Sequence, residues 1–160
     1  MTVSIVYLAL GTNLGDRPGN LQTAIAALPP GVMVLESSPV YETQPWGLTD
    51  QPHFLNMVVS GKTHLAPLVL LKYLKDLETR QGRLPSVRYG PRKIDIDILF
   101  YDNVIHKTPE LTIPHPTLHE RAFVLVPMAD LAPELVHPGL GKTIRQLLAE
   151  VDVTGVNRYG

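Results

Sequence analysis

The sequence predicts an α+β domain built on an antiparallel sheet, with two helices packed on one face of the sheet. Apolar segments with strand-like spacing alternate with two amphipathic helical segments, and Gly, Pro, Asn and Asp mark most of the boundaries. The segments follow one another in the order β-α-β-β-α-β, which is the order of the ferredoxin-like αβ sandwich. A C-terminal extension follows, and a chain of 160 residues suits a single domain over residues 1–160.

The first half of the chain contains three predicted strands and one helix. The helix begins near Pro18, because Asp16 can accept a hydrogen bond from its first turn. Two consecutive prolines at 29–30 end it. The strands are apolar or alternating stretches bounded by turn-forming residues. These elements are strand 3–10, helix 18–28, strand 32–41 and strand 53–62.

The second half begins with a helix that Pro67 opens and Gly82 ends, with leucines spaced along one side. A polar loop follows, and then an apolar strand that runs to a turn at Asp102. The extension after this turn is predicted to contain a short strand at 111–113, a helix at 122–131 and a final helix from about Thr143.

The composition limits the classes of partner and of chemistry. A formal net charge of −1 gives no general attraction to nucleic acid or to an anionic membrane. The sequence has no cysteine, which excludes disulfides, thiolate metal sites and cysteine nucleophiles. It also contains neither a long apolar run nor the amino-terminal pattern of a signal peptide. We therefore expect a cytoplasmic protein that binds neither nucleic acid nor membranes.

Asp95 and Asp97 interrupt the most strand-like apolar run of the chain. In a strand they share one face, roughly 6 to 7 Å apart, while the isoleucines around them point to the other. Neighbouring carboxylates repel unless a cation lies between them, and oxygen ligands of this kind suit Mg²⁺ bound together with phosphates. The alternative is an edge strand with a polar face, on which each aspartate pairs with a lysine or arginine.

The loop before this strand carries three arginines, Arg83, Arg88 and Arg92, among Gly, Pro and Ser residues. Such a loop is either a connector or a lid over an active site, and its own sequence leaves both readings open. Arginine is the residue type that a lid over a triphosphate would need, because its planar fork of donors matches phosphate oxygens. Arginines beside two aspartates favour a site for a metal and a polyphosphate.

Two motifs in the last third of the chain resemble known sites but do not meet their requirements. The Gly-Lys-Thr sequence at 141–143 resembles the end of a P-loop, but that motif needs a glycine where Val136 stands. His115 and His119 have the spacing of a zinc pair on a helix, yet prolines on both sides of His115 rule out that helix. His115 is then either a structural corner residue or, with Arg121, a donor to phosphate or ribose.

Phe54 and Phe123 stand out because aromatic residues are few in this chain. A single phenylalanine usually belongs to the core. The alternative is that the two rings enclose a flat heterocycle, whose donor and acceptor edge Asn56 would bind from the same strand face as Phe54.

Taken together, these segments resemble the 6-hydroxymethyl-7,8-dihydropterin pyrophosphokinase family of folate biosynthesis. The most specific match is the sequence Arg-Tyr-Gly-Pro-Arg-Lys-Ile-Asp-Ile-Asp-Ile-Leu at 88–99. Other motifs match at the expected spacing over nearly the whole chain: Leu-Gly-Thr-Asn-Leu at 10–14, Tyr-Glu-Thr-Gln-Pro at 41–45, Gln-Pro-His-Phe-Leu-Asn at 51–56, Glu78 with Gly82 and Arg83, and Leu-Thr-Ile-Pro-His-Pro at 111–116.

The resemblance implies that the terminal two phosphates of ATP move as one unit to the hydroxymethyl oxygen of the pterin, releasing AMP. It implies two Mg²⁺ ions held by Asp95 and Asp97, and charge neutralisation on the transferred group by Arg83 and Arg92. It places ATP against Glu78, Arg88, Tyr89, Ile98, Thr112, His115 and Arg121. It places 6-hydroxymethyl-7,8-dihydropterin against Thr43, Pro45, Trp46, Phe54, Asn56 and Phe123. We expect the protein to work as a monomer.

Two other functions are compatible with a sheet that carries paired aspartates. One is a two-metal nucleotidyl transferase or phosphohydrolase, for which the near-neutral charge is unfavourable if the substrate is nucleic acid. The other is a module that binds a nucleotide or metal without turnover. Nothing in such a module explains a loop rich in arginine.

Overall fold

The protein is described here from a computed structural model, in residues 2–43, 52–82 and 93–160. Within these ranges the main sheet is antiparallel and has six strands. Five of them follow the order β5-β1-β4-β3-β8, and β2 pairs with β4 beside β3. The strands are β1 (Ser4–Thr12), β2 (Met33–Ser37), β3 (Tyr41–Thr43), β4 (Phe54–Thr63), β5 (Asp95–Tyr101) and β8 (Asn157–Arg158).

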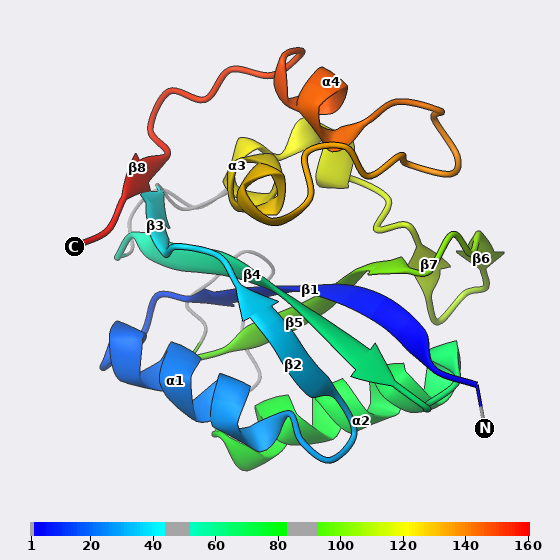
Figure 1. Cartoon of the computed structure of the whole chain (residues 1–160). Helices are drawn as coiled ribbons and strands as arrows, with labels where there is room; N and C mark the ends of the chain where they lie inside the picture. Colours follow the sequence, from blue (N-terminus) through cyan, green and yellow to red (C-terminus); the bar gives the residue numbers. More distant parts are fainter. Residues whose placement is uncertain (1, 44–51, 83–92) are drawn as a thin grey trace.

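Helices cover both faces of this sheet (Figure 1). The helices α1 (Arg17–Ala27) and α2 (Pro67–Arg80) lie on one face, as the sequence predicts. The helices of the extension, α3 (Ala122–Leu131) and α4 (Ile144–Leu148), lie on the other. The sheet is therefore the middle of three layers. A small ribbon of β6 (His106–Lys107) and β7 (Thr112–Ile113), followed by a short 3-10 turn at Leu118–Glu120, connects β5 to α3.

Local sequence signals explain most helix boundaries. The carboxylate of Asp16 accepts a hydrogen bond from the backbone N–H of Gly19 at 3.2 Å, which caps α1 as predicted. Pro67 occupies the first turn of α2, where its missing N–H has no intrahelical partner to lose. Gly82 follows the end of α2 with a φ of +97°, a conformation that favours glycine.

The single strand predicted at 32–41 is instead two strands, β2 and β3. Pro39 lies between them and has no N–H to give to a strand ladder. At this break the N–H of Ser38 donates to the carbonyl of Val58 at 2.9 Å, and the hydroxyl of Ser38 accepts from the N–H of Val58 at 2.9 Å. Both short strands thus pair with β4 in spite of the interruption.

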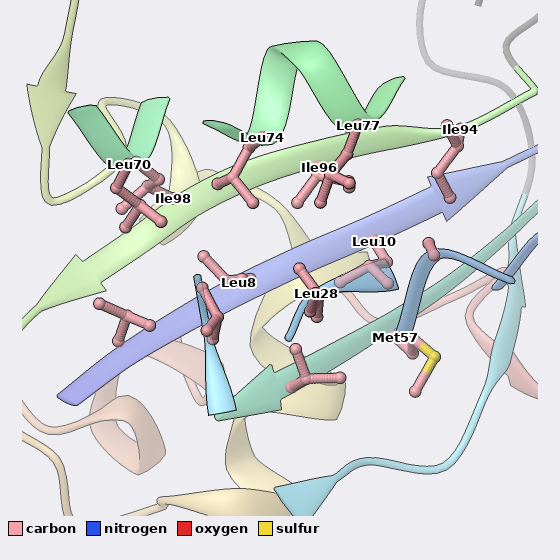
Figure 2. Close-up of a cluster of buried hydrophobic side chains, with 14 of the residues drawn as sticks. Leu8, Leu10, Leu28, Met57, Leu70, Leu74, Leu77, Ile94, Ile96 and Ile98 are labelled. Carbon is pink, nitrogen blue, oxygen red and sulfur yellow. The ribbon is translucent and has the colours of Figure 1, made fainter. Parts of the chain in front are cut away.

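Two apolar cores lie on the two sides of the sheet. The first lies between the sheet and the helices α1 and α2, where leucines of α2 pack over isoleucines of β5 (Figure 2). The second lies between the sheet and the extension and includes Val58, Leu125, Met128 and Ile144. Among the residues described, no helix is long and apolar enough to cross a membrane.

Candidate active site

Three neighbouring strands bring the central site residues into one row. Gly11 of β1 pairs with Asp95 of β5 on one side and with Asn56 of β4 on the other. Two residues before Gly11 on β1, Ala9 pairs with Asp97 and contacts the second core. Since residues paired across strands share a face, both aspartates and Asn56 face the side of the sheet that α3 covers.

The predicted alternation along β5 is confirmed. Ile94, Ile96 and Ile98 are almost completely buried in the first core, while Asp95 and Asp97 are partly exposed on the opposite face. The strand lies at the end of the sheet, as the polar-edge alternative also requires. Within the described ranges, however, Asp97 forms no ion pair with a lysine or arginine.

Gly11 provides the open floor of this row. A Cβ atom at Gly11 would lie 2.9 Å from Oδ1 of Asn56 and 3.8 Å from the ring of Phe54. The absence of a side chain therefore leaves space between Asn56 and Asp95, and exposes backbone to any flat molecule placed there. We did not expect Gly11 to be a site residue, although a glycine inside a strand is a recognised sign of close approach by a ligand.

Asn56 is held in one orientation by Thr43. Its amide nitrogen donates a hydrogen bond to the hydroxyl of Thr43 at 2.8 Å, so its carbonyl oxygen turns towards Gly11. Phe54 pairs with Thr43 in the ladder between β3 and β4 and shares their face. The structure thus brings together Thr43, Phe54 and Asn56, three of the residues predicted to bind the pterin.

The first turn of α3 supplies Phe123 above this face. Phe123 is partly buried and packs against the second core, and α3 lies over β4, the strand that begins with Phe54. The guanidinium carbon of Arg121 is 5.5 Å from the centre of the Phe123 ring, which is within the range of a cation–π interaction. A cation and an aromatic ring therefore meet at the start of this helix.

His115 lies beside Asp97 and Arg121. Its backbone N–H donates to the carbonyl of Leu99 on β5 at 3.0 Å, and its ring Nδ1 accepts from the N–H of Thr117 at 3.3 Å. Burial lowers the pKa of His115, Asp97 opposes that change, and the charge of Arg121 adds to it. The ring is therefore neutral near pH 7, and Nε2 is its donor.

The side chains of Glu78 and Ile98, both predicted to contact ATP, are buried on the side of the sheet opposite to Asp95 and Asp97. The carboxylate of Glu78 is buried on the α2 side, where it accepts a hydrogen bond from the N–H of Ile96 at 2.7 Å and lies 3.4 Å from Nζ of Lys75. The side chain of Ile98 is buried in the first core, so its contribution to a ligand site is limited to its backbone. The N–H and C=O groups of Ile98 point to the same outer edge of β5 as the N–H of Ile96, because the backbone groups of residues two apart in a strand point the same way. Thr112 of β7 is partly exposed, and β7 contacts β5.

The remaining predicted site residues lie outside the residues that the structure describes. They are Pro45, Trp46, Arg83, Arg88, Tyr89 and Arg92.

The carboxylate oxygens of Asp95 and Asp97 fit a hard cation such as Mg²⁺, which would take its remaining ligands from water and phosphate. In the part of the chain that the structure describes, no group of three or more His, Cys, Asp or Glu side chains could hold a metal. Asp95 and Asp97 alone offer carboxylate oxygens on one strand face. Mg²⁺ commonly takes one or two carboxylates and fills the rest of its octahedron with water and phosphate oxygens.

Comparison with known proteins gives consistent matches over most of the chain. A family model described as 7,8-dihydro-6-hydroxymethylpterin-pyrophosphokinase (HPPK) matches residues 7–133. A 2-amino-4-hydroxy-6-hydroxymethyldihydropteridine pyrophosphokinase from Methylorubrum extorquens is 44% identical over 154 residues, which cover 95% of this chain and 96% of the relative. One from Pseudomonas aeruginosa is 42% identical over 155 residues, covering 96% and 95%.

Other relatives are longer than this chain. The folic acid synthesis protein fol1 of Schizosaccharomyces pombe is 40% identical over 157 residues, and this chain spans 97% of itself but only 21% of fol1. A crystal structure of HPPK-DHPS in complex with substrates superposes with a TM-score of 0.77 at 18% identity, covering 94% of this chain and 43% of the other. That likeness concerns the fold. The family match and the relatives of equal length carry the assignment: this chain belongs to the 7,8-dihydro-6-hydroxymethylpterin-pyrophosphokinase family.

Proposed function

We propose that the protein transfers the pyrophosphoryl group of ATP to the hydroxymethyl oxygen of 6-hydroxymethyl-7,8-dihydropterin, giving AMP and the pterin diphosphate. This is the reaction for which its family is named, and it belongs to folate biosynthesis. The observation that carries the proposal is the row of Asn56, Gly11 and Asp95 across three strands. This row puts a group able to bind a heterocycle next to a group able to bind a metal phosphate.

The pterin would lie over Gly11, with its edge towards Asn56. The amide of Asn56 is already turned by Thr43, so its carbonyl oxygen is ready to accept from an amino or ring N–H group. Phe54 and Phe123 would bind the two faces of the ring, which is how aromatic side chains recognise flat heterocycles. Pro45 and Trp46 would also contact the pterin.

ATP would lie along the outer edge of β5. Neutral His115 donates through Nε2, and Arg121 brings a positive charge to the same place. The backbone of Ile98 and the side chain of Thr112 would contact the nucleoside from this edge. Glu78 would act indirectly, by holding the backbone of Ile96. Arg83, Arg88, Tyr89 and Arg92 would bind the phosphates and neutralise the transferred group.

Asp95 and Asp97 would hold two Mg²⁺ ions. When bound, such ions neutralise phosphate charge and align attacking and leaving oxygens for in-line displacement. The contribution of the chain is to hold both carboxylates on one face of a strand whose other face is fixed in the first core. The hydroxymethyl oxygen would then approach the β-phosphorus from the Gly11 side.

We interpret the architecture as a ferredoxin-like sandwich in one domain over residues 1–160, with the extension added to its open face. The order β5-β1-β4, with β2 and β3 as an interrupted fourth strand, supports this interpretation. We also propose a cytoplasmic monomer.

The deciding experiment mixes the protein with Mg-ATP and 6-hydroxymethyl-7,8-dihydropterin and identifies the products. We expect AMP and pterin diphosphate in equal amounts. ADP or inorganic phosphate would instead indicate a kinase or phosphohydrolase, and release of inorganic pyrophosphate would indicate a nucleotidyl transferase. ATP binding without any product would indicate a nucleotide-binding module.

A further inference from the structure

A hydrogen bond between Tyr41 and Asp130 joins the two elements that carry the walls of the proposed pterin site. The hydroxyl of Tyr41, on β3, donates to Oδ2 of Asp130, on α3, at 2.5 Å across 89 residues of sequence. Tyr41 is buried, with 9% of its surface exposed, whereas Asp130 is exposed. This bond has no assigned role in the function proposed above.

The two residues are aligned with the site by the geometry of their elements. Tyr41 pairs with Asn56 and precedes Thr43 by two positions, so its side chain shares their face of the sheet. Asp130 lies two helical turns after Phe123, which puts both residues on the same side of α3. One end of α3 therefore carries a wall of the site, and the other end is tied to the strand that carries Thr43.

Pro127 increases the importance of the hydrogen bond between Tyr41 and Asp130. It lies inside α3 and has no N–H, so the helix lacks the backbone hydrogen bond that would run from position 127 to the carbonyl of Phe123. The remaining contacts of α3 with the sheet are largely apolar, and apolar contacts are non-directional. A directional hydrogen bond on the sheet side resists a shift or rotation of the helix.

The hydroxyl of Tyr41 stays protonated, and so remains a hydrogen-bond donor, at neutral pH. Burial raises the pKa of Tyr41 to about 12, and the hydrogen bond to Asp130 and its charge act in the same direction, while Arg158 opposes them. The phenol therefore keeps its proton throughout the neutral range.

We propose that Tyr41 and Asp130 are positioning residues that set the gap between Phe123 and the Thr43–Asn56 pair, and so determine pterin affinity. This proposal rests on the proposed function of the site. Loss of the bond would widen or shift the gap on the pterin side and leave β5 and β7 in place, so its effect on ATP would be smaller and limited to Arg121 at the start of α3.

The test compares Tyr41→Phe, Asp130→Ala and the double variant with a matched control, Tyr73→Phe. Tyr73 is also a partly buried tyrosine with a hydrogen-bonded hydroxyl, which donates to the carbonyl of Leu28 at 2.7 Å, but it lies in the layer of α1 and α2 on the other side of the sheet. The probe is 6-hydroxymethylpterin, whose Kd is measured by its fluorescence, and the KM values for the pterin and for ATP are measured in parallel.

We expect both single variants to raise the Kd for 6-hydroxymethylpterin about three- to tenfold, the range expected for one lost hydrogen bond. The double variant should match the singles, because the two residues act as one unit. Asp130→Asn, which keeps an acceptor oxygen, should stay near the wild type. The KM for ATP should rise less than the Kd for the pterin in every variant, and Tyr73→Phe should lose stability without losing pterin affinity.

Equal pterin affinity in Tyr41→Phe and the wild type would overturn the positioning role, and a lower unfolding free energy in that variant would then show a purely structural bond. A rise in the KM for ATP as large as the rise in the pterin Kd would also overturn it. A wild-type protein that does not bind 6-hydroxymethylpterin would overturn the proposed function together with this inference. The two failures are therefore distinct.

Discussion

The carboxylate of Glu78 accepts its hydrogen bond from Ile96, the residue that stands between Asp95 and Asp97. A buried side chain of α2 thus fixes the backbone of β5 at the midpoint of the proposed metal pair. The strand that carries the two aspartates is therefore held from the side of α2.

Glu78→Ala should lower the free energy of unfolding by roughly 1 to 3 kcal/mol, because it leaves the N–H of Ile96 buried without its acceptor. The same change should raise the Mg²⁺ concentration needed for half-maximal activity. Urea unfolding and a Mg²⁺ titration of the turnover measure the two effects. Asp76→Ala is the matched control, since Asp76 is an exposed acid of the same helix that pairs with Lys72. Equal stability of both variants would show that Glu78 is not an anchor.

Gly11→Ala should weaken pterin binding by about tenfold or more, since the added methyl would lie 2.9 Å from Oδ1 of Asn56 and fill the floor of the site. ATP affinity in the same variant is the internal control and should change little. Pterin Kd and ATP Kd, measured by calorimetry, check this. Unchanged pterin affinity would mean that the ring does not lie over Gly11.

Asp97→Asn should lower turnover by at least about 100-fold, on the scale seen when one group that stabilises a transition state is removed. The fold should survive with equal or greater stability, because the change relieves repulsion between two carboxylates. Removal of divalent cations with a chelator should abolish turnover in the wild type, and added Mg²⁺ should restore it. Full activity of Asp97→Asn, or of the chelated enzyme, would contradict the metal assignment.

Tyr41 should titrate above the ordinary range of a tyrosine. Its pKa is raised from 10.0 to about 12, so its bonded phenol stabilises the fold fully below pH 10 and loses this contribution as the pH rises towards 12. An ultraviolet titration of phenolate should therefore lack its highest step in Tyr41→Phe. A normal pKa for Tyr41 would show that its bond to Asp130 does not persist in solution.

Local periodicity was enough to predict the parts of the site that depend on a single element. The two-residue repeat of a strand separated the aspartates of β5 from the isoleucines, and the Asp16 cap marked the start of α1. The match of ordered motifs added the pterin residues, of which Thr43, Phe54 and Asn56 do meet in the structure.

The parts that depend on distant contacts were not predicted from the sequence. The bond from Tyr41 to Asp130 joins residues far apart in sequence, and no local pattern specifies such a pair. The break at Pro39 was overlooked because the flanking residues keep a strand-like pattern on both sides. Glu78 was assigned to ATP through the resemblance alone, and only the packing of α2 shows that its carboxylate is buried.

The alternation along β5 divides the effects of natural selection between neighbouring residues. Substitutions at Ile94, Ile96 or Ile98 alter the first core and should reduce the amount of folded protein in the cell, whereas substitutions at Asp95 or Asp97, on the other face, should act mainly on the chemistry. Constraints on folding and on catalysis thus fall on alternate codons of a single strand. A substitution that the protein tolerates at one position of β5 therefore does not indicate whether a substitution at the next position is tolerated.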